Sequence, residues 1–261
     1  MTLVLAVAGG VALLMTGAWL IQRATGNASW VDAIWPLATG LAGIAFALAP
    51  VAHWPPNARQ IVLAAVIGLW ALRLAGHIAR RTAGAREDPR YHELRTTWGE
   101  AAQSRFFWFF QLQGVTAVFL ALALLLAAYN PAPFPTPLDL AGIALVLLAI
   151  AGEALSDAQL AGCKRRGASL CDSGLWRFSR HPNYFFEWLG WWAYPLMAID
   201  PRLDYGLGWA ALLAPAFMYW LLAHVSGVPP LERHMLAKHG AAYAAYQQRT
   251  PAFFPGVRGR S

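Results

Sequence analysis

Charged residues are scarce in this sequence. Asp, Glu, Lys and Arg make up 13% of the 261 residues, whereas they are about a quarter of an average soluble domain. Hydrophobic residues reach 58%, and the mean hydropathy is +0.42. This shortage of charge excludes an ordinary soluble globular protein and predicts an all-α, polytopic integral membrane protein.

Cysteine is also rare, with only Cys163 and Cys171 in the chain. Two thiols without accompanying histidines do not make a zinc site, so we expect no metal. The two cysteines flank the basic run Lys164-Arg165-Arg166, which the charge pattern below places in the cytoplasm. Because disulfides are rare in that reducing compartment, we expect both cysteines to be unpaired structural residues.

Long apolar runs are abundant, and about 20 such residues are enough to cross a bilayer. We find seven, at residues 2–22, 30–50, 60–80, 106–128, 137–160, 182–199 and 206–225. No positive residue precedes the first run, so we interpret it as an uncleaved span and not as a signal peptide. We expect residues 1–261 to form a single membrane domain, with substrate-side helices in 1–130 and a cofactor-binding half in 137–255.

The positive charge is distributed unevenly between alternate connectors. Seventeen of the 20 Lys and Arg residues follow the first, third, fifth and seventh runs, two lie in the opposite connectors, and Arg73 lies inside the third run. Cytoplasmic loops collect such residues, so the pattern predicts an external N-terminus and a cytoplasmic C-terminus. It also accounts for most of the net charge of +7, which leaves no reason to expect nucleic-acid binding.

Several polar residues fall inside the apolar runs, where a charge is costly and usually marks a site or pathway. They are Asp32, the pair Arg73 and His77, the pair Glu153 and Asp157, and the pair Asn183 and Glu187. Interhelical hydrogen bonds that fix packing are the alternative explanation. The last two pairs share the depth of the loop Lys164-Arg165-Arg166, which favours one polar cavity open to the cytoplasm.

The start of the sixth run has the features of an anion site. Pro182 suits the first position of a helix, and a helix N-terminus attracts phosphate or carboxylate. Arg180, His181 and the basic loop add donors, which favours a cofactor bearing several phosphates. Anchoring of Arg180 and His181 at lipid headgroups is the alternative.

The tail has a helical pattern of aromatic and hydrogen-bonding residues: Glu232, His239, Tyr243, Tyr246 and Arg249. These groups could close over a nucleotide, because tyrosine offers both a ring for stacking and a hydroxyl. The tail could equally be a helix that lies on the membrane surface.

The stretches Ser156-Asp157, Lys164-Arg165-Arg166, Gly174-Leu175-Trp176, Ser179 to Trp188 and Glu232 to Pro255 resemble the C-terminal half of the steroid 5α-reductase family, and its bacterial branch most closely. The resemblance covers residues 140–255 well and the first 130 loosely. It implies a seven-helix membrane reductase that uses NADPH to saturate the Δ4 bond of a 3-oxosteroid or a related flat lipid. With the groups above, the predicted cofactor set is Asp157, Lys164, Arg165, Arg180, His181, Asn183, Tyr184, Glu187, Glu232, His239, Tyr243, Tyr246 and Arg249.

Reduction of an enone needs a hydrogen-bond donor near the oxygen that gains electron density. Asp32, Arg73 and His77 are the candidate catalytic residues, with His77 or a protonated Asp32 able to donate. In the resemblance, Asp32 is the counterpart of the catalytic Gln-Glu pair of the mammalian enzymes. We expect a bacterial inner-membrane protein whose hydrophobic, steroid-like substrate enters from the bilayer.

Two other functions remain open. Membrane methyltransferases of the isoprenylcysteine and phospholipid type share the Arg180-His181-Pro182-x-Tyr184 start and the tail Glu232, and use S-adenosylmethionine. The second is a small transporter or lipid-binding protein. The clustering of the intramembrane charges towards one face argues against transport.

Overall fold

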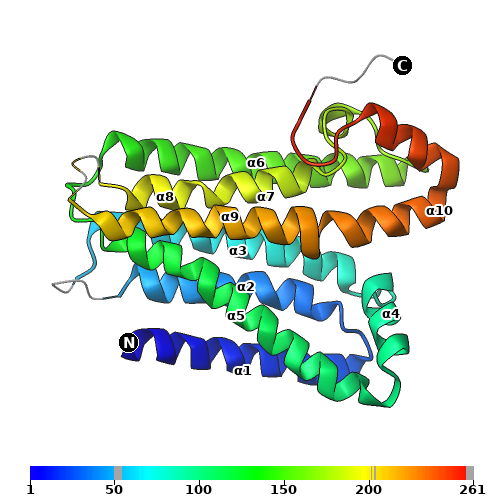
Figure 1. Ribbon diagram of the computed structural model, residues 1–261, viewed down its shortest axis with the longest axis horizontal. Helices are drawn as coiled ribbons and strands as arrows, with labels where there is room; N and C mark the ends of the chain where they lie inside the picture. The colour runs from blue at the N-terminus through cyan, green and yellow to red at the C-terminus, as the bar shows by residue number, and fades with distance from the viewer. Residues whose placement is uncertain (50–54, 201, 203, 257–261) are drawn as a thin grey trace. The chain divides into compact units, whose positions relative to one another are not determined.

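The computed structural model describes residues 1–49, 55–200, 202 and 204–256, which form helices, turns and loops with no strand among them (Figure 1). The α-helices are α1 (Thr2–Thr25), α2 (Trp30–Ala47), α3 (Ala58–Thr82), α4 (Pro89–Trp98), α5 (Ala102–Ala128), α6 (Pro137–Arg165), α7 (Pro182–Trp191), α8 (Ala193–Ala198), α9 (Leu213–Trp220) and α10 (Val228–Arg249). Short 3₁₀ segments form η1 (Gly99–Ala101), η2 (Gly174–Arg177) and η3 (Gly206–Leu212), and η4 (Leu221–Val225) is a π-helix.

Six helical stretches of the described chain are long and apolar enough to cross a membrane: α1, α2, α3, α4 to α5, α6, and η3 to α10. The mean hydropathy of their most apolar windows lies between 1.3 and 2.1. The prediction of an all-α, polytopic membrane protein is therefore confirmed. Each of the six corresponds to one of the predicted apolar runs, although α2 ends at Ala47, before the predicted end of the run 30–50, and residue 50 lies outside the described residues.

The predicted span 182–199 is divided into two short helices, α7 and α8. Pro195 explains the break, because proline has no N–H to donate to the carbonyl four residues earlier. That carbonyl belongs to Trp191, the last residue of α7. Next to the break, the N–H of Trp192 donates to Leu189 O, three residues earlier, at 3.2 Å. This is a tighter turn than an α-helix makes.

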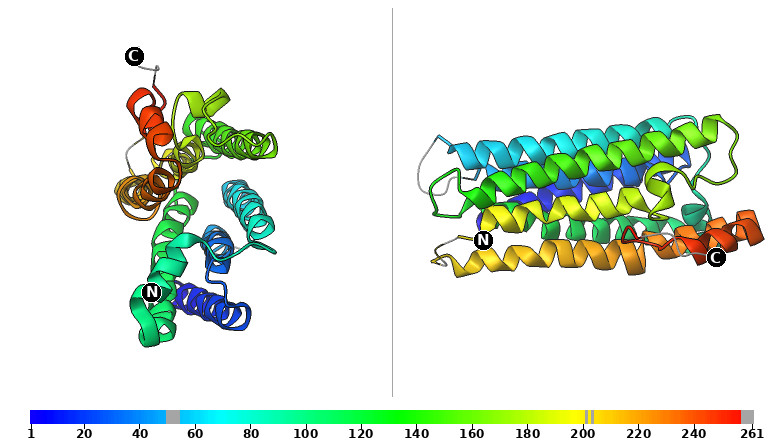
Figure 2. Two further views of the ribbon diagram at one scale, coloured as in Figure 1. Left: turned by 90° about the vertical axis from the view of Figure 1, so that its right-hand side faces the viewer. Right: turned by 90° about the horizontal axis from the view of Figure 1, so that it is seen from above.

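The chain forms two compact units, here called unit 1 and unit 2. Unit 1 comprises residues 1–138 and 197–211. Its core contains Met15, Phe46, Phe106 and Phe110, all fully buried. In α2, a β-carbon on Gly40 would lie 2.3 Å from Ala71 Cβ, so this glycine lets α2 and α3 approach closely. Figure 2 shows these helices running along one another.

Unit 2 comprises residues 139–196 and 212–261, and in it α6, α7 and α9 run side by side. Aromatic rings join α7 and α9 to the tail that follows α10. The ring centroid of Trp188 lies 6.0 Å from that of Tyr219 and 5.4 Å from that of Phe254. Phe254 of this tail is thus packed onto helix α7.

Candidate functional site

The carboxylate of Glu232 on α10 is the centre of a polar cluster in unit 2, here called the Glu232 cluster. Arg180 approaches it with two nitrogens, Nε at 2.7 Å from Oε1 and Nη2 at 2.9 Å from Oε2. His181 Nε2 lies 2.9 Å from Oε1, and the Tyr243 hydroxyl donates to the same oxygen at 3.1 Å. Gln247 Nε2 donates to Oε2 at 2.6 Å. Four side chains therefore hold this one carboxylate.

Hydrogen bonds to backbone carbonyls hold the segment before α7 beside the tail that follows α10. The N–H of Arg180 donates to Pro251 O at 2.9 Å, and Ser179 Oγ donates to Phe253 O at 2.9 Å. The segment before α7 is therefore tied to the tail beyond α10. Since Glu232 lies on α10, this pairing holds Arg180 within reach of its carboxylate.

His181 is almost fully buried, with 2% of its surface exposed. Burial lowers the pKa of His181, and the Glu232 carboxylate acts in the opposite direction. In a neutral imidazole only one ring nitrogen carries a proton. The contact with Glu232 assigns that proton to Nε2, which leaves Nδ1 as an acceptor, and Nδ1 has no hydrogen-bond partner in the described part of the chain.

The predicted role of Arg180 and His181 as donors around a phosphate does not match their contacts. Besides Glu232, Arg180 donates through Nη1 to the carbonyl oxygens of Gln247 and Thr250. Every donor nitrogen of its guanidinium therefore has a protein partner. The positive charge that the sequence places before α7 is compensated by Glu232.

A second basic feature of unit 2 is a pocket of about 470 Å³ at the end of α6, here called the basic pocket. It is lined by Ala158, Gln159, Gly162, Arg165, Arg166, Ser173 and Gly174. Both arginines are exposed residues at the end of α6. Guanidinium groups bind phosphate with paired hydrogen bonds, so this pocket has the donors that an anionic ligand needs.

The expectation that the cysteines are unpaired is wrong for this structure. Cys163 and Cys171 form a disulfide, with their Cα atoms 5.6 Å apart. After α6 ends, Gly167 adopts a φ of 72°, a left-handed conformation that favours glycine. The chain thereby turns back on itself and brings Cys171 to the end of α6, a proximity that the eight-residue spacing alone did not show.

The predicted tail residues divide into two groups. Tyr243 belongs to the Glu232 cluster, whereas Tyr246 and Arg249 attach α10 to the loop before α7. The Tyr246 hydroxyl donates to Trp176 O at 2.5 Å, and Arg249 Nη2 lies 2.9 Å from Asp172 Oδ2. His239 lies outside the cluster, next to a break in α10 at Gly240, where φ is 50°.

The predicted residues of α6 and α7 lie within the helices of unit 2. Asp157 and Glu187 are buried, with 8% of their surfaces exposed. Glu187 Oε1 accepts a hydrogen bond from Trp191 Nε1, one turn along α7, at 3.0 Å. Asn183 and Tyr184 occupy the first turn of α7, and the Tyr184 ring stacks on His181 with centroids 5.5 Å apart.

Asp32, the first catalytic candidate, makes its contacts with α4 of unit 1. Arg90 Nη2 lies 2.9 Å from Asp32 Oδ2, and the Tyr91 hydroxyl donates to Oδ1 at 2.5 Å. These contacts occupy both carboxylate oxygens of Asp32. Arg73 and His77 lie on α3, half-buried. Gly40 faces Ala71 and Gly68 faces Ile44, so α2 and α3 are antiparallel and Asp32 and His77 lie near the same end.

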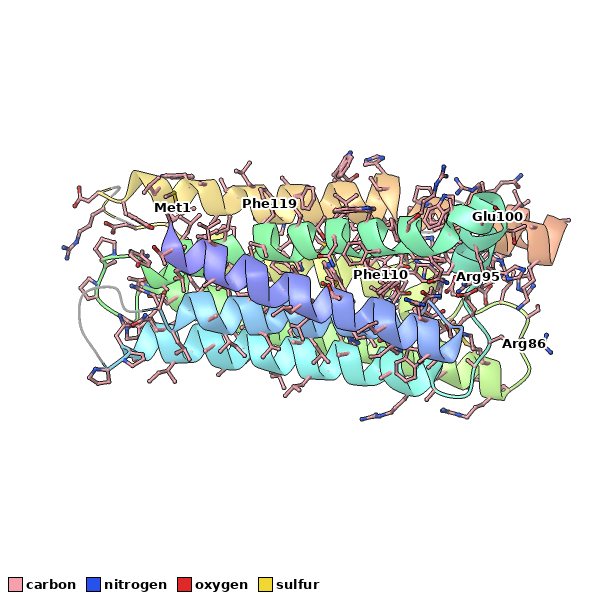
Figure 3. All side chains as sticks on the ribbon, turned by 90° about the horizontal axis from the view of Figure 1, so that it is seen from below. Met1, Arg86, Arg95, Glu100, Phe110 and Phe119 are labelled. Carbon is pink, nitrogen blue, oxygen red and sulfur yellow. A yellow bond between two sulfur atoms is a disulfide. The ribbon has the colours of Figure 1, made fainter. Side chains whose placement is uncertain are left out.

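The loop before α4 is fastened to the turn between α1 and α2. Glu87 accepts hydrogen bonds from the N–H of Ala28 at 2.8 Å and from Arg95 Nη2 at 2.7 Å. Burial raises the pKa of Glu87, but these donors outweigh it and hold the pKa below its usual value. Figure 3 shows Arg86, Arg95 and Glu100 gathered at the end of unit 1 opposite Met1.

Some contacts of these sites were not predicted from the sequence. Gln247 lies one turn after Tyr243 on α10, and this spacing could have placed it on the same face. Arg90 and Tyr91 offered no such signal, because they lie in a polar helix outside the predicted apolar runs.

Comparison with known proteins identifies a family. No curated protein and no solved structure matches the sequence. One family model, described as "Protein of unknown function (DUF1295)", matches residues 18–250, which is most of the chain and includes both the Glu232 cluster and the basic pocket. The chain belongs to this DUF1295 family.

Proposed function

We propose that this protein is an NADPH-dependent membrane reductase that saturates the C=C bond of an enone in a flat hydrophobic substrate such as a 3-oxosteroid. The observation that carries the proposal is the basic pocket, where Arg165 and Arg166 line a space of about 470 Å³. A cofactor with several phosphates needs such donors. The resemblance of residues 140–255 to the steroid 5α-reductase family supports the same reading.

The donors present in unit 2 fit a dinucleotide. Arg165 and Arg166 would hold its phosphates, and Lys164, in the last turn of α6, adds positive charge beside them. The Nε of Arg249 is a further buried donor that has no hydrogen-bond partner in the described part of unit 2. NADPH supplies a hydride when bound, and a hydrophobic enone accepts it at the β-carbon.

The proposed catalytic residues, Asp32, Arg73 and His77, belong to unit 1. The carbonyl oxygen of the enone gains electron density as the hydride arrives, so a hydrogen-bond donor must face this oxygen. The α-carbon of the enone then takes a proton. His77 is the proposed donor, because both carboxylate oxygens of Asp32 are already engaged by Arg90 and Tyr91. Asp32 would act by holding Arg90 and Tyr91 in place. Arg73, one turn before His77, would stabilise the oxygen.

The setting of the reaction follows from the charge distribution. The protein is proposed to lie in a bacterial inner membrane with its C-terminus and basic pocket facing the cytoplasm, where NADPH is present. The substrate would enter from the bilayer.

A second candidate is an S-adenosylmethionine-dependent methyltransferase. The observation that favours it is the Glu232 cluster, in which Arg180 and His181, from the shared motif, meet the shared tail glutamate. The basic pocket favours the reductase, because S-adenosylmethionine carries no phosphate.

Ligand-dependent melting of the purified protein in detergent distinguishes the two. We expect NADPH to raise the melting temperature, NADH to raise it less, and S-adenosylmethionine to leave it unchanged. The double substitution Arg165→Gln and Arg166→Gln should weaken NADPH binding at least tenfold, while Arg177→Gln, at an exposed arginine outside the pocket lining, should not. Stabilisation by S-adenosylmethionine alone would overturn the reductase proposal.

A further inference from the structure

The disulfide of unit 2 closes the loop that carries the basic pocket. Between Cys163 and Cys171 lie seven residues, and the first six of them, from Lys164 to Ser169, are exposed. The two arginines of the pocket belong to this loop, and its remaining walls are Ala158, Gln159 and Gly162 before the disulfide and Ser173 and Gly174 after it. The bond therefore joins the two edges of the pocket.

A guanidinium lies beside one of the sulfur atoms. Arg166 Nη2 is 3.5 Å from Cys163 Sγ, while Cys171 Sγ is 3.8 Å from the carbonyl oxygen of Gln159. A neighbouring positive charge favours a thiolate, which is the form that reacts in thiol–disulfide exchange. The same arginine thus lines the pocket and contacts the reactive pair.

The disulfide also packs against Trp176, the residue to which helix α10 is hydrogen-bonded. Cys163, Cys171 and Trp176 form one buried cluster. The carbonyl of Trp176 accepts the hydrogen bond from Tyr246 of α10, and its indole nitrogen donates to Ser156 O at 3.0 Å. Loss of the disulfide would therefore remove a constraint on the segment 164–170 and on the contact between Trp176 and Tyr246.

We propose that Cys163 and Cys171 form a reversible disulfide that regulates the basic pocket, with the oxidised pair giving high affinity for phosphate-bearing ligands and the reduced pair giving low affinity. A loop that is ordered before binding loses less entropy when the ligand arrives. The proposal rests on the proposed function in placing the cofactor phosphates at this pocket. A reversible bond also explains why a disulfide lies on the side that the charge pattern assigns to the cytoplasm. Disulfides in that compartment are usually transient and form or break with its redox state.

The redox step is a thiol–disulfide exchange with a small disulfide such as oxidised glutathione. One cysteine thiolate attacks the external disulfide and releases one glutathione thiolate. The other cysteine then attacks the mixed disulfide, forms the Cys163–Cys171 bond and releases the second glutathione. The protein pair loses two electrons and two protons, and oxidised glutathione becomes two molecules of the thiol.

The test uses the full chain in detergent, equilibrated in glutathione buffers of different redox ratio. Maleimide labelling of free thiols followed by mass spectrometry gives the fraction of disulfide. Calorimetry on the same samples measures binding of inorganic pyrophosphate and, separately, of NADPH. We expect pyrophosphate to bind at least about fivefold more tightly to the oxidised protein.

The matched variants are Cys171→Ser and Cys163→Ser, each of which should show the weak affinity in every buffer. Arg166→Gln should reduce pyrophosphate affinity and also slow formation of the bond, whereas Arg177→Gln should change neither. A melting curve of each variant shows whether it is folded. The conservative pair Cys163→Ala with Cys171→Ala provides a second reduced-state form.

The outcomes separate this inference from the proposed function. Absence of the bond in every buffer, or equal pyrophosphate affinity of the oxidised and reduced forms, would overturn the regulatory role even if NADPH binds. Failure of NADPH to bind, with redox-dependent pyrophosphate affinity retained, would overturn the reductase and leave the regulated anion pocket.

Discussion

At the scale of single residues, the Glu232 carboxylate is contacted by four side chains, those of Arg180, His181, Tyr243 and Gln247. The Glu232 and Arg180 side chains are 14% and 10% exposed, so both charges are largely withdrawn from solvent. Removing one partner of such a pair leaves the other charge buried and uncompensated, which costs more than the pair itself contributes.

The substitution Glu232→Gln keeps the shape of this side chain and removes its charge. We expect it to lower the free energy of unfolding by about 3 kcal/mol, because Arg180 then lacks its counter-charge. Unfolding by SDS in mixed micelles measures the change. Glu100→Gln, at an exposed glutamate after α4, is the control and should stay within about 0.5 kcal/mol of the parent protein. Equal stability of the two variants would show that the cluster contributes little.

At the scale of helices, the contact of α6 with α7 depends on a glycine. A β-carbon built on Gly152 would lie 2.4 Å from two ring carbons of Phe186. Real side chains do not approach so closely, so either the phenylalanine ring or the helix would have to move. Gly9 on α1 is the opposite case, since a β-carbon there would meet nothing within 4 Å.

This difference predicts opposite effects of one substitution at two helical glycines. We expect Gly152→Ala to lower the free energy of unfolding by about 1–3 kcal/mol through overpacking. Gly9→Ala should be neutral or stabilising by up to about 1 kcal/mol, because alanine favours a helix more than glycine does. The two variants are compared by melting in the same detergent. If Gly152→Ala proved as stable as Gly9→Ala, the close approach of α6 and α7 would be refuted.

At the scale of the whole molecule, the distribution of Lys and Arg predicts the orientation in the membrane. The connectors with few positive charges include the proline-rich segment 130–137, and the connectors rich in arginine include the segment 81–105, which contains Arg81, Arg86, Arg90, Arg95 and Arg105. Pro133 and Arg86 are exposed residues of these two segments. Each can therefore report the side of the membrane on which its segment lies.

Single-cysteine labelling tests the orientation. In a background with Cys163→Ser and Cys171→Ser, we expect Pro133→Cys to react with a membrane-impermeant maleimide added to intact cells. Arg86→Cys should react only after the cells are opened, because it lies on the side where the positive charges collect. Labelling of Arg86→Cys in intact cells would reverse the orientation, and with it the proposed access of the basic pocket to cytoplasmic NADPH.

The amino-acid sequence by itself determined the class of the protein and most of its spans. Hydropathy is a property of each segment, and it adds up along the chain without reference to partners. Six predicted apolar runs therefore lie in the long apolar helical stretches. The break of the run 182–199 comes from Pro195, a local feature that hydropathy does not register. Glu232, Tyr243, Arg180 and His181, all predicted to contact a cofactor, lie together in the Glu232 cluster, and their role toward a cofactor stays a prediction.

Only the tertiary structure decided what each polar residue binds. A side chain pairs with whatever the fold brings within about 3 Å, and segments far apart in sequence supplied those partners: α10 for Arg180, and α4 for Asp32. The same limit applied to the cysteines, whose spacing allowed a bond but did not show the turn that makes it. Local composition thus specified which segments are apolar enough to cross a membrane, and long-range contacts specified which charges are neutralised.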